Sequence, residues 1–451
     1  MKCIFRQATI INEGQSFVSD LLVSNHRIEK IAPNISLGRS IRYEEINAEG
    51  LILIPGMIDD QVHFREPGLT HKGTIETESR AAVAGGITSF MEMPNTIPNV
   101  LNLQLLEEKY QLAQENSWAN YSFFMGISKN NLEDALRIDN ELVCGITDDG
   151  LYFNDEEGIL ANHPYFLEKL FDRSNSLIAL HSEDDAIIDQ NLLEFKEKYG
   201  RQIPCEFHSN IRTSEACLSA TKRVLDLAKK ANNRLHFFHI STHDEAKLFA
   251  EFHGDLKNKR ITSEACIHHL FFNESHYQTL GNKIKWNPSV KTLGDNNGLI
   301  NALNNDVIDI IATDHAPHSW DEKNGDYFSA KSGGPLVQHA LLVLLELYKQ
   351  GKISLEKMVE KTSHHVAEIY RIPDRGYIRE GYYADLVLID LYSATDVTKE
   401  SLLYKCGWSP FENAKFSTSI NRTYVNGNLV YDKTSQSNFT PGFRLKFEKI
   451  R

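Results

Sequence analysis

Residues 51–68 read LILIPGMIDDQVHFREPG, a short apolar run that ends in a cluster of polar side chains. Aliphatic and β-branched residues in such a run favour a strand. Alternate residues on a strand face the same side, so Asp59, Gln61 and His63 are expected to point together. One His at a strand end is typical of a metal ligand but also of a structural core residue. The rest of the chain has to decide between these two interpretations.

Seven further apolar runs follow the first, with amphipathic segments such as EACLSATKRVLDLAKKAN (215–232) between them. The eight runs are 51–58, 87–93, 121–127, 142–147, 177–180, 235–240, 260–265 and 307–313. Short apolar runs that alternate with amphipathic segments indicate β-α-β units. Eight of them predict the α/β class and a (β/α)8 TIM barrel, whose active sites lie at the carboxyl ends of the strands.

The two ends of the chain have a different pattern. Residues 1–54 are short β-rich runs broken by Asn, Gly and Pro, and residues 376–451 repeat this pattern, with a hairpin turn at Asn426–Gly427. The sequence therefore predicts a small β-sandwich domain built from 1–54 and 376–451. The catalytic barrel is predicted to span 55–375.

Composition narrows the class of partner and the compartment. The 451 residues are 41% hydrophobic and carry a formal net charge of -13, which disfavours nucleic acid and anionic membranes. No run approaches the ~18 apolar residues of a membrane span. Six cysteines without a CxxC pair are typical of reduced thiols, so a cytoplasmic protein is expected.

Side chains suited to metal binding or acid–base chemistry follow six of the eight runs. They are Gln61 and His63, Asn95, Asp149, His181, His239 and Asp314. A random scatter of His and Asp would also fall on helices and hairpin tips. In a barrel, these positions meet at one mouth.

Two of these motifs have an alternative interpretation. The adjacent carboxylates of TDDG (147–150) repel each other unless a cation lies between them, but they also fit a solvated Asp-Gly turn. The acids of HSEDD (181–185) could accept a hydrogen bond from a metal-bound His181, or start a helix with Ser182 as N-cap. The helix start explains the acids but not His181. His236 lies three residues before His239 and is interpreted as structural.

ATDHAPH (312–318) closes the series with Asp314 at the end of a continuous apolar run. A carboxylate there can both bind a metal and transfer protons. Imidazoles and carboxylates with open positions together suit Zn²⁺ or a similar divalent ion.

Several motifs together resemble those of dihydroorotases of the amidohydrolase superfamily, in the same order and over essentially the whole chain. They are PGMIDDQVHFREPGLTHKG, GGITSFMEMPNT, TDDG, HSEDD, HIST, KWNPSVK and ATDHAPH, with GYYADLVLID and VNGNLVYD near the end. The sequence is most similar to the bacterial type with a bridging Asp.

The resemblance implies reversible cyclisation of N-carbamoyl-L-aspartate to L-dihydroorotate in pyrimidine biosynthesis, with one or two Zn²⁺ per chain. It implies that His63 and the bridging Asp149 bind metal, that His181 and His239 hold the second metal, and that Asp314 is both ligand and general acid/base. Arg65, Asn95 and His318 would hold the substrate carboxylate, and Asn287 the ring. An Arg fork matches a carboxylate, and a net negative chain needs such a local clamp.

Gln61 departs from the family pattern, which has His-x-His on the first strand. A neutral amide oxygen is a weaker donor than imidazole for a zinc-like ion. Gln61 could ligate weakly, the first metal position could be empty, or the protein could be an inactive relative kept for binding. KSGGPLVQHAL (331–341) also fits the family only loosely, and the preceding WDEKNGDYFSA (320–330) is either a lid or a solvated loop.

Two rival functions stay open beside the dihydroorotase. One is a hydantoinase or allantoinase, although Arg65, Asn95 and His318 favour a substrate that bears a carboxylate. The other is a catalytically inactive partner protein, which Gln61 would explain. The expected partner is a small-molecule substrate, with no nucleic acid and no membrane, and a homodimer stays open as the assembly state.

Overall fold

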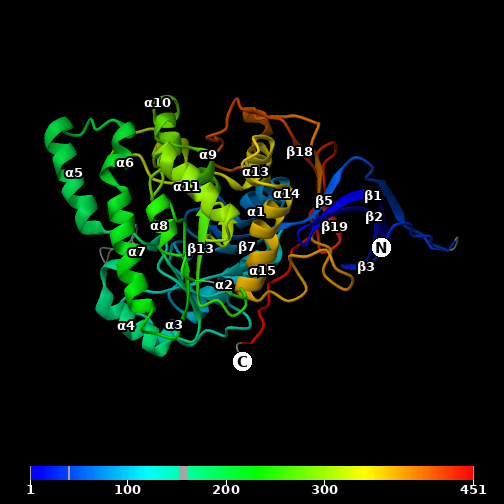
Figure 1. Cartoon of the computed structure of the whole chain (residues 1–451), viewed down its shortest axis with the longest axis horizontal. Helices are drawn as coiled ribbons and strands as arrows, with labels where there is room; N and C mark the ends of the chain where they lie inside the picture. Colours follow the sequence, from blue (N-terminus) through cyan, green and yellow to red (C-terminus); the bar gives the residue numbers. More distant parts are fainter. Residues whose placement is uncertain (1, 39–40, 152–159, 253, 450–451) are drawn as a thin grey trace.

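The computed structural model describes residues 2–38, 41–151, 160–252 and 254–449. Its centre is a barrel of parallel strands surrounded by helices, and a β-sheet lies at one side (Figure 1). The barrel strands are β6 (Met57–Val62), β7 (Ile87–Glu92), β8 (Asn120–Phe123), β9 (Met125–Gly126), β10 (Ile146–Thr147), β11 (Leu177–Leu180), β12 (Arg234–Phe237), β13 (Ile261–Cys266) and β14 (Ile310–Ala312). All eight predicted runs contribute, since β8 and β9 share the run 121–127.

The barrel closes between its first and last strands. Two parallel sheets, β6-β7-β8 and β9 to β14, meet at Phe124, which links β8 to β9. At the other seam, Val62 forms a parallel bridge with His315, and the His63 backbone N–H donates to the His315 carbonyl at 2.8 Å. The closure brings His63 and Asp314 to adjacent places on the mouth.

The predicted strand 51–58 is in fact two strands. β5 (Ile52–Pro55) belongs to the side sheet and β6 to the barrel, and Gly56 lies between them. A Cβ at Gly56 would lie 2.2 Å from the Thr88 side chain on the neighbouring strand, so only glycine permits this approach. The chain therefore crosses from sheet to barrel within one continuous apolar run, which periodicity alone does not reveal.

Helices connect successive barrel strands, and further helices follow the last of them, β14. They are α1 (Ile75–Ala84), α2 (Leu103–Asn116), α3 (Leu132–Ala135), α4 (Pro164–Arg173), α5 (Asp185–Tyr199), α6 (His208–Ile211), α7 (Ser214–Ala228), α8 (His243–Lys247), α9 (Ile267–Phe271), α10 (Tyr277–Leu280), α11 (Leu293–Asn304), α12 (Trp320–Lys323), α13 (Ala340–Lys349), α14 (Leu355–Val359) and α15 (His365–Tyr370). In α7, Ala216, Ala220 and Val224 recur every four residues on the buried face, as an amphipathic barrel helix requires. The helix begins at Thr213, whose side chain accepts from the Ala216 backbone N–H.

A plug of apolar side chains fills the end of the barrel opposite the mouth. Val366, Ile369 and Tyr370 of α15 pack in one cluster with strand residues such as Ile58 and Phe238. Burial of this apolar surface stabilises the barrel at about 25 cal/mol per Å² removed from water. The rigid lower end leaves chemistry to the opposite rim.

Both ends of the chain join in one eight-stranded mixed sheet, on the right in Figure 1. Its strands are β1 (Lys2–Asn12), β2 (Gln15–Ser24), β3 (Arg27–Ala32), β4 (Glu44–Asn47), β5, β15 (Leu386–Asp390), β18 (Ser419–Val425) and β19 (Asn428–Asp432). The predicted hairpin turn is confirmed, with positive φ at Asn426 and Gly427 (51° and 75°). β16 (Thr395–Asp396) pairs with β17 (Lys415–Phe416) separately. The domain division at 54/55 and 375/376 stays a prediction.

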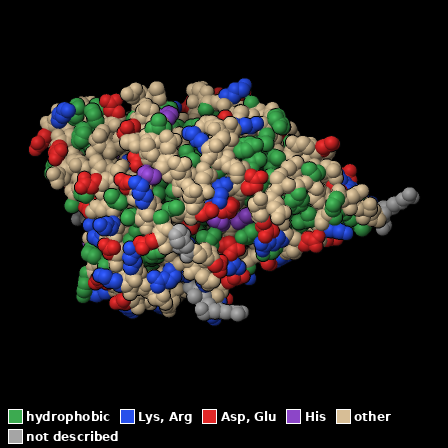
Figure 2. All heavy atoms as spheres, in the orientation of Figure 1, with side chains coloured by type: hydrophobic (Ala, Val, Ile, Leu, Met, Phe, Trp, Pro, Cys, Tyr) green, Lys and Arg blue, Asp and Glu red, His purple; other side chains and the backbone are tan. Residues whose placement is uncertain are grey.

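The surface has no extended region of one charge on the face in Figure 2, where Lys and Arg are interspersed with Asp and Glu. All six cysteines are free. Within the described ranges, no helix combines the length and apolar character needed to span a bilayer.

Candidate metal centre and substrate cavity

A cavity of about 120 Å³ opens at the carboxyl ends of the barrel strands. Seven of the predicted site residues line it: His63, Arg65, Asn95, Asp149, Asn287, Asp314 and His318. Gln61, His181 and His239 do not line the cavity, but they lie in contact with Asp149. The structure thus brings the whole predicted set together, from strands that are far apart in the sequence.

Asp149 is the centre of the cluster. Its Oδ2 lies 3.4 Å from His63 Nε2 and accepts a hydrogen bond from Gln61 Nε2 at 3.2 Å. Its Oδ1 lies 3.6 Å from His181 Nδ1 and 3.9 Å from His239 Nε2. One carboxylate therefore faces two separate groups of donors, the arrangement that a bridging ligand needs.

The donors on the Oδ1 side fit a divalent cation. Asp149, His181 and His239 offer three buried donor atoms within 4.8 Å of one another, and the two imidazole nitrogens are 3.0 Å apart. Tetrahedral Zn²⁺ with bonds of about 2.0–2.2 Å would separate its ligand atoms by about 3.3–3.6 Å. The observed spacings of 3.0, 3.6 and 3.9 Å lie around that value.

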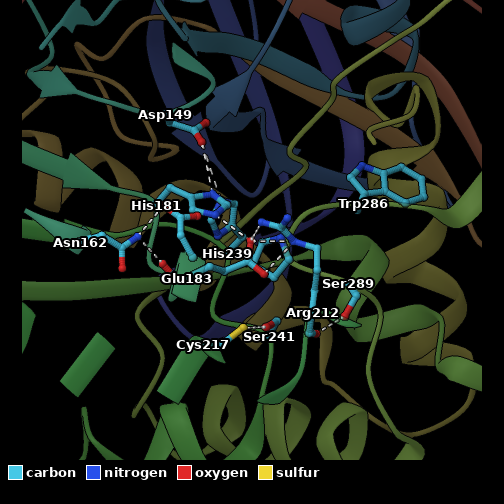
Figure 3. Close-up of polar contacts among 12 residues, drawn as sticks. Asp149, Asn162, His181, Glu183, Arg212, Cys217, His239, Ser241, Trp286 and Ser289 are labelled. Carbon is cyan, nitrogen blue, oxygen red and sulfur yellow. Dashed lines mark hydrogen bonds and ion pairs between the residues drawn. The ribbon is translucent and has the colours of Figure 1, made fainter. Parts of the chain in front are cut away.

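Glu183 supports this group from behind. His181 Nε2 lies 2.8 Å from Glu183 Oε2, and Arg212 pairs with the same carboxylate (Figure 3). An acceptor on the outer nitrogen fixes the tautomer of a metal-binding imidazole and leaves the inner nitrogen free to ligate. Glu183 lies within the HSEDD motif and provides the acceptor that the sequence predicted. Asp184, two residues before Ala186, caps α5 instead.

The donors on the Oδ2 side are less complete. His63 Nε2 lies 3.2 Å from Asp314 Oδ1, and its Nδ1 lies 2.9 Å from Asn95 Oδ1. Gln61 directs its amide nitrogen towards Asp149, while its oxygen accepts from Cys266 Sγ at 3.3 Å. In this orientation Gln61 donates a hydrogen bond where a ligand would have to offer a lone pair.

Electrostatics also places positive charge at the cluster. Burial lowers the pKa of His63, but hydrogen bonds to Asp149 and Asp314 outweigh it and raise the value to about 9. The pKa of His181 is likewise raised to about 9 by Asp149 and Glu183, despite burial. Burial opposes ionisation of Asp149, yet its three imidazole partners hold its pKa well below the usual range. A divalent cation that binds here would replace these protons, because a metal-binding imidazole is neutral.

The backbone is strained where it presents these side chains. Arg65, His239 and Asp314 have positive φ values of 75°, 37° and 50°. Non-glycine residues in this region are uncommon and concentrate at functional sites. Gly150, after the two aspartates, has φ of 74°, and a Cβ there would lie 2.3 Å from the Asn95 amide nitrogen.

A second buried group of three donors lies deeper in the barrel: Asp60, His236 and Glu264. His236 Nε2 is 3.4 Å from Asp60 and 3.2 Å from Glu264, and Tyr370 donates to Asp60. Burial raises the pKa of both acids well above the usual range and lowers that of His236, so the group is close to neutral. Sequence reasoning had set His236 aside, because nothing in the pattern showed the Asp60 and Glu264 contacts.

Cationic side chains form the opposite wall of the cavity. Arg65 is 5% exposed, donates to the Pro317 carbonyl at 3.0 Å and lies 3.3 Å from His318 Nε2. It makes no ion pair with a carboxylate of any described residue. Burial lowers its pKa to about 10, so it stays charged at neutral pH.

His318 is held between two donors, since Lys72 Nζ lies 3.2 Å from its Nδ1. Burial keeps the pKa of His318 well below its usual value, so the ring is neutral and has a single acceptor nitrogen. It cannot satisfy both Arg65 and Lys72. Arg65 and Lys72 therefore keep N–H groups that can donate hydrogen bonds to an anion in the cavity.

Seven lining residues were not predicted individually: Leu69, Lys72, Trp286, Ala316, Lys331, Ser332 and Gly333. Lys72 lies inside the opening motif and Trp286 beside Asn287, so proximity to a predicted residue was the available signal. Lys331 begins the stretch 331–341, which the sequence analysis noted as a loose fit to the family without assigning a role to this lysine.

Sequence comparisons relate the chain to known proteins. The profile of the family described as "Amidohydrolase family" matches residues 52–430. A dihydroorotase of Methanosphaera stadtmanae is 32% identical over 381 residues, which cover 84% of this chain and 85% of the relative. A dihydroorotase of Streptococcus pneumoniae is 32% identical over 424 residues, covering 93% and 96%.

Solved structures share the fold. The L-hydantoinase (dihydropyrimidinase) of Arthrobacter aurescens superposes with a TM-score of 0.89 at 23% identity, and 99% of each chain is covered. The dihydropyrimidinase of Brevibacillus agri gives a TM-score of 0.86 at 22% identity over 100% of both chains. At this identity the likeness establishes the architecture alone.

Proposed function

The chain belongs to the amidohydrolase family, and from this premise we propose that it is a dihydroorotase. The reaction would be the reversible opening of L-dihydroorotate to N-carbamoyl-L-aspartate. Relatives named dihydroorotase at 30–32% identity support this choice within the family.

One observation carries the proposal: the buried, unpaired Arg65 lies on the same cavity as Asp149 and Asp314. A guanidinium without a carboxylate partner costs several kcal/mol of desolvation, and a substrate carboxylate would offset that cost with paired hydrogen bonds. Dihydroorotate combines such a carboxylate with a cyclic amide. The end of the cavity at Arg65 suits the carboxylate, and the end at Asp149 and Asp314 suits the cyclic amide.

The chemistry would follow from the two ends. Asp149, His181 and His239 would hold a divalent cation, which would supply Lewis-acid polarisation of the amide carbonyl and make the attacking water more acidic. Asp314 takes a proton from the attacking water and delivers it to the ring nitrogen. The carbonyl carbon gains the water oxygen and its bond to that nitrogen breaks. A ureido NH₂ and a carboxylic acid form, and the acid releases the second proton of the water to solvent as it becomes a carboxylate. The reverse sequence closes the ring.

Asn95 and Asn287 would orient the ring. Asn95 Oδ1 is occupied by His63, which leaves its Nδ2 hydrogens for the substrate carboxylate. Asn287 Oδ1 has no hydrogen-bond partner among the described residues and lines the cavity, so it can accept from a ring N–H. His318 and Lys72 would complete the carboxylate site beside Arg65.

The donor geometry favours one tightly held Zn²⁺ per chain. Three donors converge on the Oδ1 side of Asp149, whereas Gln61 on the Oδ2 side turns its N–H towards the carboxylate. A cation on the Oδ2 side would have His63, Asp149 and Asp314 but would repel the Gln61 amide hydrogens. We propose that this second ion is absent or weakly held.

Gln61→His tests the metal count. Imidazole would replace an amide donor with a lone-pair donor, so metal content should rise from about one to about two ions per chain. Metal analysis after dialysis against limiting zinc gives the ratio. Gln61→Asn serves as the control and should leave it unchanged. An unchanged ratio in Gln61→His would contradict the assigned place of residue 61.

Arg65→Met tests the substrate. The wild type, supplied with zinc, should open L-dihydroorotate and prefer it by at least about 10²-fold over hydantoin, which lacks the carboxylate. Arg65→Met should lower kcat/KM for dihydroorotate by about 10²–10³-fold, the cost of leaving a buried carboxylate unpaired. Ring opening is followed by loss of ultraviolet absorbance.

Three outcomes would redirect the assignment. Faster opening of hydantoin by the wild type would favour a hydantoinase. Binding of N-carbamoyl-L-aspartate without any turnover would favour an inactive partner protein. The six free thiols support a reducing compartment, and we place the activity in the cytoplasm. A homodimer stays a prediction.

A further inference from the structure

The loop at the outer rim of the cavity is held rigidly by two buried lysines. Lys285 Nζ donates to the carbonyls of Tyr327 and Ala330, both at 2.6 Å. Lys323, fully buried in α12, donates to the carbonyls of Lys331 and Gly333 at 2.9 and 2.6 Å. These four hydrogen bonds from two buried amino groups fix the backbone of residues 327–333.

Lys331 projects from this fixed backbone onto the cavity, which it lines with Ser332 and Gly333. Its side chain is exposed and makes no hydrogen bond or ion pair with any described residue. Its neighbour Lys72 differs, because Lys72 pairs with Glu322 at 3.0 Å. Lys331 is therefore a positive charge presented to the mouth without an internal partner.

The charges around the cavity are asymmetric. Among its described lining residues the acids are Asp149 and Asp314, both at the inner end. Arg65, Lys72 and Lys331 supply the cations, with Lys331 outermost. The whole chain carries a net charge of -13, which repels an anionic substrate at long range. Positive side chains at the rim attract an anionic substrate at short range, although the net charge of the chain is negative.

We propose that Lys331 is a specificity-determining residue that draws anionic substrates into the cavity and helps to hold them there. The proposal rests on the dihydroorotase function proposed above. N-carbamoyl-L-aspartate carries two carboxylates, of which Arg65 accounts for one. Lys331 supplies the charge that the second meets on its way past the rim, before that group reaches the metal end.

An exposed lysine could instead be a solvated surface group with no influence on the substrate. The fixed loop argues against that, because two buried lysine amino groups hold the backbone around a residue whose side chain bonds to no described residue. The two interpretations differ in salt dependence. A rim charge that acts on an anion loses its effect as ions screen it, over a Debye length of about 10 Å at 0.1 M salt.

Lys331→Gln is the decisive variant, with kcat/KM for L-dihydroorotate measured from about 0.02 to about 0.5 M salt. We expect kcat/KM to fall by about 3–10-fold at low salt and to approach the wild-type value at high salt, since steering by local charge changes rates by about 10-fold or more. Lys331→Arg should restore the rate. Lys331→Glu should reverse the slope, so that added salt speeds the reaction.

Lys230→Gln is the matched control, because Lys230 is exposed, unpaired among the described residues and placed before β12, at the end of the barrel away from the mouth. It removes the same charge and should leave the salt slope unchanged. Equal slopes for Lys331→Gln and the wild type would overturn the proposal, as would an equal loss in Lys230→Gln.

A failure of the proposed function would be distinguishable from a failure of this inference. If the wild type shows no turnover, calorimetry with N-carbamoyl-L-aspartate replaces the kinetic measurement. A Kd raised about 3–10-fold at low salt in Lys331→Gln supports the rim role without any catalysis. An unchanged Kd refutes it.

Discussion

Asp314→Asn is expected to lower turnover of L-dihydroorotate by about 10²–10⁴-fold, the usual contribution of a positioned general acid/base. Asn has nearly the same shape but cannot take up the proton of the attacking water or return it to the ring nitrogen. Asp314 leaves β14 with a positive φ and lies 3.2 Å from His63 Nε2, so its carboxylate is fixed at the inner end of the cavity. Initial rates across the pH range measure the loss.

The control separates proton transfer from stability. Asp321→Asn removes a carboxylate seven residues further on, in the exposed first turn of α12, and should leave kcat unchanged. Thermal unfolding and zinc content of Asp314→Asn should stay close to the wild type, because three other donors remain on the Oδ1 side of Asp149. Retained turnover in a folded, metal-loaded Asp314→Asn protein would remove Asp314 from the proton path.

Asp149→Asn is expected to have the second large effect, loss of the metal. Its carboxylate contacts both groups of donors among the described residues, and an amide would present one neutral oxygen in place of two charged ones. We expect zinc affinity to fall by at least about 10²-fold, beyond the 10–100-fold typical of losing only an outer-shell partner. Competition with a chromogenic chelator measures the change, and activity should fall in parallel.

Asp148→Asn is the natural comparison, since the two residues are adjacent and equally buried. Asp148 accepts backbone N–H groups from Leu160 at 2.9 Å and His181 at 3.4 Å, and burial raises its pKa to about 7. Asn keeps one of these bonds, so the variant should lose about 1 kcal/mol of stability and keep its zinc. If both variants lost zinc equally, the bridging place would not belong to Asp149 alone.

The strand pattern was readable because burial imposes it. LIAL (177–180) is buried at every position, as a strand covered on both faces must be, and His181 follows directly. The side chains were then expected to converge, because the carboxyl ends of all strands in such a barrel lie at one rim. The eight runs and the terminal hairpin needed nothing beyond these local signals.

Other features depend on contacts between distant segments and could not be predicted in this way. The break at Gly56 depends on Thr88 in the next strand, and the Asp60–His236–Glu264 group on three strands with separate patterns. The direction of the Gln61 amide is set by Cys266, 205 positions later. Lys331 is placed by the buried amino groups of Lys285 and Lys323, contacts that the motif at 331–341 does not record.

The seam between β6 and β14 separates the two groups of donors around Asp149 by the order in which their strands leave the ribosome. Asp149, His181 and His239 follow β10, β11 and β12, which are neighbours in one sheet, so a nascent chain that has passed β12 already contains them. His63 and Asp314 become neighbours only when the last strand docks on the first. The three donors around Asp149 Oδ1 thus come from neighbouring strands of one sheet, whereas the contact between His63 and Asp314 requires the ring to close.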